Sequence, residues 1–142
     1  MEAADEDDSS AELGDYALLG TVPVFSATAV DALLDLLEKN GELLPVRYSR
    51  KEYMAYNVTR VIDALDERQS TILRFTTGRI MSITKYAFDP ELLINAPIFK
   101  IPQLPLAYVF VSDVFVNRVR DKGLTGFSFR PTWIASRFAF PG

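Results

Sequence analysis

The sequence predicts a single α+β domain, in which two main helices pack on a mainly antiparallel sheet of about six strands. Two segments repeat apolar residues at helical spacing, and several short apolar runs are separated by polar turns of hairpin length. With 142 residues, 49% of them hydrophobic, the chain is long enough to bury one core without a disulfide or a metal. We therefore expect one folded domain, over residues 16–142.

An acidic leader is expected before this domain, over residues 1–15. It holds seven of the nineteen acidic residues and almost no bulky apolar side chain. It cannot bury enough surface to offset the entropy lost on ordering, so we expect it to be disordered. The next run, residues 16–25, is apolar and contains Pro23, which is typical of an extended segment at a sheet edge.

Two amphipathic helices are predicted, over residues 28–40 and 112–122. In the first, apolar residues recur at i, i+3, i+4 and i+7, at Val30, Leu33, Leu34 and Leu37. Ser26 and Thr28 both suit its N-cap, and the pair Asn40–Gly41 predicts a left-handed stop. The second helix starts at a serine and carries basic residues near its end, where the helix macrodipole favours cations.

The strands are predicted mostly as hairpins. Residues 43–48 and 52–58 flank a polar turn, and residues 71–76 and 79–86 flank Thr77–Gly78. In this second pair the apolar positions are too irregular to show which face is buried. The remaining predictions are a short helical turn over residues 89–93 and three short strands, over residues 98–101, 108–111 and 125–130.

The composition excludes most familiar enzyme chemistry. The chain has no Cys and no His, which removes the usual zinc sites, disulfides and the Cys–His and Ser–His–Asp catalytic groups. It also lacks the glycine-rich phosphate-binding loops of the P-loop and G-x-G-x-x-G types. We therefore expect no cofactor and no metal. Only carboxylate, hydroxyl or Lys chemistry, or oxygen-ligated Mg or Ca, is left open.

Charge is divided unevenly along the chain. The formal net charge is −4, yet residues 1–38 hold ten acidic and no basic residues, whereas residues 39–142 hold nine acidic and fifteen basic ones, or +6. The overall acidity argues against nucleic-acid binding. Neither a basic start followed by an apolar run nor an uncharged run long enough to span a membrane is present. We expect a cytoplasmic protein with no membrane partner.

Residues 57–70 combine acidic and basic side chains. Asp63, Asp66 and Glu67 stand beside Arg60 and Arg68, and paired carboxylates are what acid–base or metal chemistry would need. If this segment is helical, Asp63 and Glu67 share a face and Arg60 neutralises one of them. We favour an ion-paired structural turn over a catalytic site, because a working acid is usually buried beside an apolar wall.

The predicted hairpin of residues 43–58 combines aromatic and basic residues. Tyr48, Tyr53 and Tyr56 are interleaved with Arg47, Arg50, Lys51 and Arg60. Tyr and Arg are enriched at the energetic centres of protein interfaces, so this hairpin is a candidate binding surface. The alternative, which we weigh more heavily, is that strand alternation buries part of the set in the core and solvates the rest.

The order of the segments resembles a known family. The segments are LLPV (43–46), NVTRVIDALD (57–66), IFKI (98–101), VFVSD (109–113) and GLTGFSF (123–129). Over residues 16–133 this set resembles immunity-protein family eleven of bacterial polymorphic toxin systems, formerly a domain of unknown function. The resemblance implies an antitoxin that binds the cognate toxin of its own cell, often one delivered by contact-dependent or type VI secretion. The family offers no agreed catalytic set, so no residue role is carried over.

Three functions remain to be separated. The leading hypothesis is a non-enzymatic antitoxin that occludes its cognate toxin. The candidate toxin-binding residues are Glu52, Tyr53, Tyr56, Arg60, Asp63, Asp66, Glu67 and Arg68. The alternatives are an enzyme centred on Asp63, Asp66 and Glu67, dependent on carboxylates or on Mg or Ca, and a regulatory module that binds another protein. A homodimer is left open.

Overall fold

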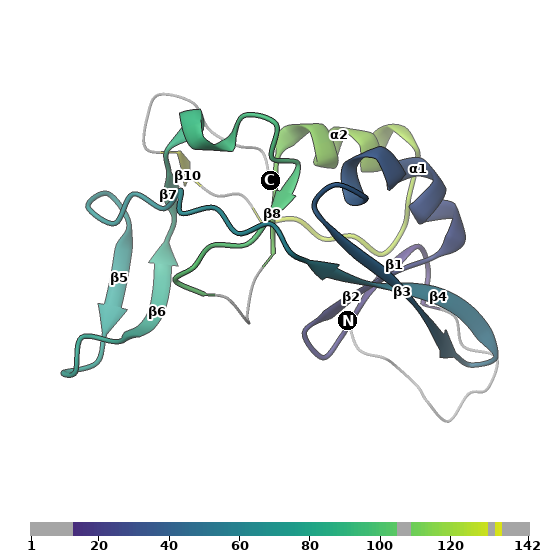
Figure 1. Ribbon diagram of the computed structural model, residues 1–142, viewed down its shortest axis with the longest axis horizontal. Helices are drawn as coiled ribbons and strands as arrows, with labels where there is room; N and C mark the ends of the chain where they lie inside the picture. The colour runs from purple at the N-terminus through teal and green to yellow at the C-terminus, as the bar shows by residue number, and fades with distance from the viewer. Residues whose placement is uncertain (1–12, 105–108, 131–132, 135–142) are drawn as a thin grey trace.

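The fold is known from a computed structural model, which describes residues 13–104, 109–130 and 133–134 (Figure 1). It contains two α-helices and mostly antiparallel strands, so the predicted α+β class is confirmed. The strands are distributed over one four-stranded sheet and three two-stranded ribbons. The predictions for residues 1–12 and for Tyr108 lie outside the described residues.

The four-stranded sheet is antiparallel throughout and has the order β1-β2-β4-β3. Its strands are β1 (Tyr16–Leu19), β2 (Val22–Phe25), β3 (Gly41–Tyr48) and β4 (Lys51–Val58). β3 and β4 form the predicted hairpin, with an unbroken register from Gly41 opposite Val58 to Tyr48 opposite Lys51. The turn between them places Ser49 and Arg50 at positive φ, which matches the twist of the strands.

Both predicted helices form. α1 (Ala27–Leu37) starts at Ser26, whose side chain accepts a hydrogen bond from the backbone N–H of Ala29 at 3.1 Å. α2 (Asp113–Asp121) starts after Ser112. The two helices contact each other, and α1 packs on β2 and β4 (Figure 1). The apolar side of α1 therefore closes the main core over the sheet.

Gly41 does not act as the predicted left-handed stop. The helix ends at Glu38 with right-handed backbone, and Gly41 has no positive φ but starts β3. A Cβ on Gly41 would overlap the carbonyl oxygen of Asn57 and lie 2.6 Å from Cζ of Tyr56. Glycine is needed there for the close approach of β3 to β4, not for a turn.

A second core is built from short elements that follow β4. They are β5 (Thr71–Arg74), β6 (Ile80–Lys85), β7 (Ala87–Phe88), the 3₁₀ turn η1 (Pro90–Leu93), β8 (Ile98–Phe99) and β9 (Phe110–Val111). A further strand, β10 (Trp133–Ile134), comes after α2. β5 pairs with β6 and β8 with β9, both antiparallel, while β10 runs parallel to β7. Phe88, Phe99 and Phe110 pack with ring centroids 5.2–5.8 Å apart at the centre of this core.

Residues 125–130 do not form the predicted strand. Phe127 and Phe129 are half-buried and alternate with exposed Ser128 and Arg130, as the sequence pattern predicts, yet no strand of the described residues pairs with them. Aromatic contacts hold the segment instead: the ring of Phe127 stacks on the ring of Tyr16, and their centroids are 4.6 Å apart. This segment, residues 124–130, covers the start of the four-stranded sheet, and we call it the aromatic cover.

The folded part begins earlier than expected. Leu13 is only 7% exposed, and its N–H donates a hydrogen bond to Oη of Tyr53 at 3.2 Å. The carboxylate of Asp15 accepts hydrogen bonds from the N–H and hydroxyl of Thr125 and from the hydroxyl of Ser26. Residues 13–15, which the sequence assigns to the acidic leader, are therefore packed on the domain.

Candidate functional site

The charged segment between β4 and β5 is extended rather than helical. The N–H of Ile62 donates to the carbonyl of Lys100, and the N–H of Lys100 donates to the carbonyl of Arg60, both at 2.9 Å. Further along, Leu65 forms a bridge with Phe88 and is buried. The buried apolar side chains hold this segment on the second core, so its charged side chains face outward.

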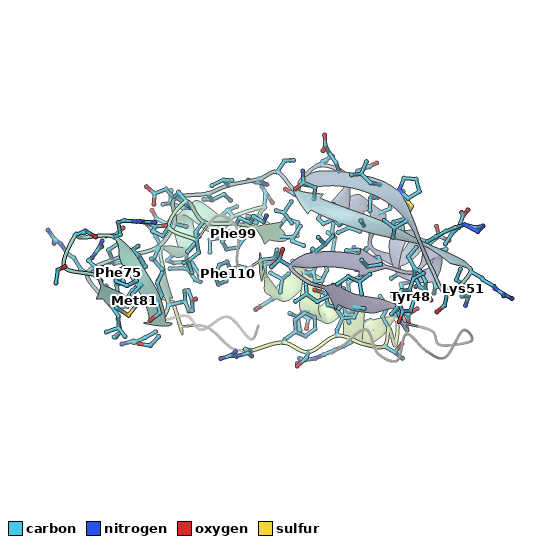
Figure 2. All side chains as sticks on the ribbon, turned by 90° about the horizontal axis from the view of Figure 1, so that it is seen from below. Tyr48, Lys51, Phe75, Met81, Phe99 and Phe110 are labelled. Carbon is cyan, nitrogen blue, oxygen red and sulfur yellow. The ribbon has the colours of Figure 1, made fainter. Side chains whose placement is uncertain are left out.

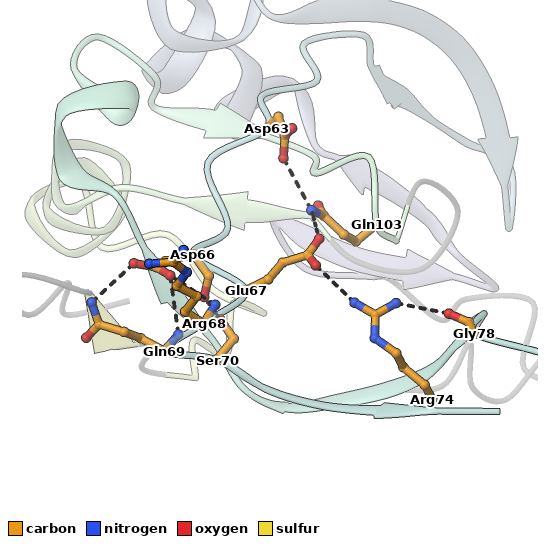
Figure 3. A network of polar contacts seen from close by, with 9 residues as sticks. All are labelled: Asp63, Asp66, Glu67, Arg68, Gln69, Ser70, Arg74, Gly78 and Gln103. Carbon is orange, nitrogen blue, oxygen red and sulfur yellow. Dashed lines mark hydrogen bonds and ion pairs between the residues drawn. The ribbon is translucent and has the colours of Figure 1, made fainter. Parts of the chain in front are cut away.

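Asp63 and Glu67 are brought together by a residue that the sequence analysis missed. Nε2 of Gln103 donates to Oδ1 of Asp63 at 3.2 Å and to Oε2 of Glu67 at 2.9 Å (Figure 3). An amide NH₂ has two protons, one for each carboxylate. On its other side Glu67 is bound by Arg74, at 2.9 Å, and Arg74 also donates to the carbonyl of Gly78 at 3.0 Å. Nothing in the sequence around Gln103 indicates this role, since it depends on a contact between distant segments.

Asp66 stabilises the turn that follows it. Its Oδ1 accepts hydrogen bonds from the backbone N–H groups of Arg68 and Gln69, at 3.1 and 3.3 Å, and its backbone carbonyl accepts one from the hydroxyl of Ser70. This is the geometry of an Asx turn, which an Asp side chain closes without a partner elsewhere. The three acidic residues therefore do not converge. Among the described residues, no three His, Cys, Asp or Glu side chains are grouped so that they could hold a metal ion.

Arg60 does not pair with Asp63, as the helical reading would require. Its Nη1 donates to Oδ1 of Asn40 at 3.0 Å and to the carbonyl of Asn95 at 2.7 Å. In an extended chain, residues three apart are separated by about 10 Å, which is beyond the reach of an ion pair on one face. Arg60 instead joins the end of α1 to the turn after η1.

Tyr53 and Tyr56 are core residues, so the expectation that they stand on the surface as aromatic anchors is wrong. They are 4% and 1% exposed. They lie three residues apart on β4 and so point to opposite faces of the sheet, and both faces are covered. Oη of Tyr56 donates to the carbonyl of Leu37 at 2.5 Å, and burial raises the pKa of the Tyr56 hydroxyl far above its usual range. The alternative reading of this hairpin, burial by strand alternation, holds for both.

The structure divides the predicted site between two places. Glu52 lies beside the turn of the β3–β4 hairpin, and its Oε2 is 3.8 Å from Nη2 of Arg47. Both side chains are largely exposed. Asp63, Asp66, Glu67 and Arg68 lie near the β5–β6 hairpin (Figure 3). Figure 2 shows that the two hairpins are at opposite ends of the molecule, with Lys51 at one end and Phe75 at the other. No single surface therefore carries all eight predicted residues.

A match with a family model decides the family. The model, described as the immunity protein family Imm11, matches residues 47–133, which is more than half of the chain. The chain belongs to the Imm11 family. The resemblance seen in the sequence is confirmed, although the match starts at Arg47 and not at Tyr16. It includes both hairpin turns, the polar network around Gln103 and the aromatic cover.

Neither a curated protein nor a solved structure matches this Imm11 chain. Within the described ranges, α1 and α2 both fall short of the length and hydrophobicity that a membrane-crossing helix requires.

Proposed function

We propose that this chain is an antitoxin that binds the cognate toxin of its own cell and neutralises it by covering a surface that the toxin needs. The observation that carries the proposal is the Imm11 match over residues 47–133. The partner is the toxin protein, with neither nucleic acid nor a membrane as ligand. In this proposal the chain acts in the cytoplasm against a toxin delivered by contact-dependent or type VI secretion. Occlusion asks only for a complementary surface.

The arrangement of the acidic residues favours occlusion over catalysis. A carboxylate enzyme would need Asp63, Asp66 and Glu67 to converge in a cleft beside an apolar wall. Instead, Asp66 closes its own turn, and Gln103 and Arg74 occupy the carboxylate of Glu67. Asp63 and Glu67 are both exposed, so neither carboxylate lies beside the apolar wall that a catalytic acid needs.

Stoichiometry tests this proposal. The cognate toxin is identified by pull-down with the full chain, its toxic domain is purified, and the activity of that domain is titrated with increasing amounts of the full chain. Occlusion predicts a linear fall in activity that ends at a fixed ratio of chain to toxin, together with a stable complex in gel filtration. Slow and complete inactivation by a small fraction of that amount would contradict occlusion and indicate catalysis.

A truncated chain that lacks residues 1–12 provides the matched control. The acidic residues that this truncation removes act over distance and are screened by salt, so they affect the rate of encounter more than the stability of a complex. We expect the same end point in the titration and the same protection of toxin-expressing cells. Loss of protection on this deletion would place the inhibitory contact in the leader.

A further inference from the structure

The β5–β6 hairpin exposes apolar side chains on the face turned away from the core. On one face, Ile72, Ile80 and Ile83 pack into the second core. Three other apolar side chains of the hairpin lie outside the second core: Leu73, Phe75 and Met81 are 48%, 50% and 52% exposed. Leu73 lies opposite Ser82 in the register of the hairpin, and Phe75 directly follows the end of β5. Figure 2 shows Phe75 and Met81 together at this end of the molecule.

The backbone of this hairpin is arranged against pairing with further strands. In its register Arg74 lies opposite Ile80 and Leu73 opposite Ser82, which leaves Met81 without a partner, and a second shift leaves out Thr84. Extra residues of this kind are β-bulges, which increase twist and make a strand edge a poor template for another strand. We therefore expect a partner to bind the side chains of the hairpin and not its edges.

The charge of the hairpin indicates the kind of partner. Residues 68–88 contain Arg68, Arg74, Arg79 and Lys85 and no Asp or Glu, and Arg74 is paired with Glu67, just before this range. A second copy of the chain would bring the same basic residues against each other in a two-fold contact, which is unfavourable. The apolar side chains within a basic surround fit an acidic surface that contains an apolar recess.

We propose that the exposed face of the β5–β6 hairpin, with Phe75 and Met81 as its anchors, is the main docking surface for the toxin, and that the toxin presents an acidic surface with an apolar recess. This rests on the proposed antitoxin function. Phe75 supplies a large apolar contact area, and Arg79 beside it steers encounter. At the base of the hairpin, Asp63 is bound to Gln103, and Glu67 is bound to Gln103 and Arg74.

The docking surface is tested with the double variant Phe75→Thr, Met81→Thr. Threonine keeps the strand propensity and removes the apolar anchors. With the purified toxic domain identified by pull-down as the probe, we expect the Kd to rise about tenfold or more, mainly through faster dissociation, and the melting temperature to stay close to that of the wild type. The matched control is Leu44→Thr on β3, because Leu44 is 54% exposed at a distance from this hairpin. It should leave the Kd unchanged.

Charge reversal gives an independent measurement that does not disturb the apolar face. Arg79→Glu is expected to slow association and to reduce its dependence on salt. If the wild type binds the toxin while the double variant and Arg79→Glu bind equally well, the docking surface is elsewhere and the antitoxin function stands. If the wild type neither binds nor protects, the antitoxin function itself fails. A wild-type dimer that the double variant converts to monomer would assign this face to self-association and overturn the proposal.

Discussion

The two long hairpins of this protein differ in how deeply they are buried, although each consists of two short strands joined by a polar turn. β3 and β4 pair over eight consecutive positions, whereas the register of β5 and β6 is shifted twice. β4 lies between β2 and β3 in its sheet, α1 packs on it, and it buries Tyr53 and Tyr56, while β5 has no neighbour other than β6 among the described strands. Burial is thus decided by what packs on a hairpin, and not by the composition of the hairpin itself.

This contrast explains why composition does not indicate which aromatic residues are exposed. Tyr and Arg on residues 43–58 are typical of a binding surface, but the contacts that cover Tyr56 come from Phe25 and from the carbonyl of Leu37, far away in the sequence. In the β5–β6 hairpin, the sequence pattern does not single out Phe75. No described strand extends this hairpin on either side. The tertiary environment overrides the local pattern in both places.

The largest effect is expected from Tyr56, at the buried centre of the first hairpin. Tyr56→Ala should lower the free energy of unfolding by about 3–5 kcal/mol, the usual range for removing a buried aromatic side chain. Tyr56→Phe isolates the hydroxyl. The carbonyl of Leu37 still accepts a hydrogen bond from the N–H of Asn40 at 3.1 Å, so we expect a loss of only about 0.5–1.5 kcal/mol. Urea unfolding measures both.

Urea unfolding of Phe75→Ala tests the contrast between the two hairpins, because the side chain of Phe75 is half exposed. Surface substitutions usually stay within about 0.5 kcal/mol. If Phe75→Ala destabilised the chain as much as Tyr56→Ala, the β5–β6 hairpin would be as deeply integrated as the β3–β4 hairpin, and the contrast would be wrong.

A smaller effect is expected from the glycines of the two hairpins. Gly41→Ala places a methyl group against the backbone of Asn57, and crowding of this kind costs about 1–3 kcal/mol. Gly78, in the β5–β6 turn, has φ of +91°, and a Cβ added to it would meet no atom of the described residues within 4 Å. Asn tolerates positive φ better than other residues, so Gly78→Asn should cost less than about 1 kcal/mol.

Replacing Gly41 and Gly78 by Asn, one at a time, separates lack of space from positive φ as the cause of destabilisation. Thermal unfolding measures the loss for each variant. Because Gly41 is needed for space and not for positive φ, Gly41→Asn should be at least as damaging as Gly41→Ala. Equal losses for Gly41→Asn and Gly78→Asn would mean that close strand packing does not distinguish the two hairpins.

Local signals predicted the elements of this fold better than their contacts. Helical spacing and N-cap residues located both helices, and the turn chemistry located both hairpins, because these features act within a few residues. The Gln103 bridge between Asp63 and Glu67 spans 36 to 40 residues of sequence, and the Tyr16–Phe127 stack joins the two ends of the domain. Such contacts leave no periodic trace, so the candidate site could be predicted only as a list of charged residues and not as a geometry.

The smallest effect is expected where the aromatic cover is attached to the first strand. Burial raises the pKa of the Asp15 carboxyl, but hydrogen bonds from the backbone N–H of Thr125 and from the hydroxyls of Ser26 and Thr125 together hold it below its usual value. Because the pKa is lower in the folded than in the unfolded chain, the stabilisation is fully present above the unfolded pKa of about 3.9. It is lost as the pH falls through the folded pKa.

Asp15→Asn should therefore destabilise the chain at pH 7 by less than about 1 kcal/mol, as expected for an exposed interaction, and the difference from the wild type should shrink as the pH is lowered towards 3. Urea midpoints at several pH values measure this, with Asp31→Asn on the exposed side of α1 as the control. A difference that stays constant with pH would show that the Asn side chain disturbs packing and that charge is not the cause. Because the aromatic cover lies over β1 and not over β5, loosening it should leave the proposed toxin binding at the β5–β6 hairpin unchanged.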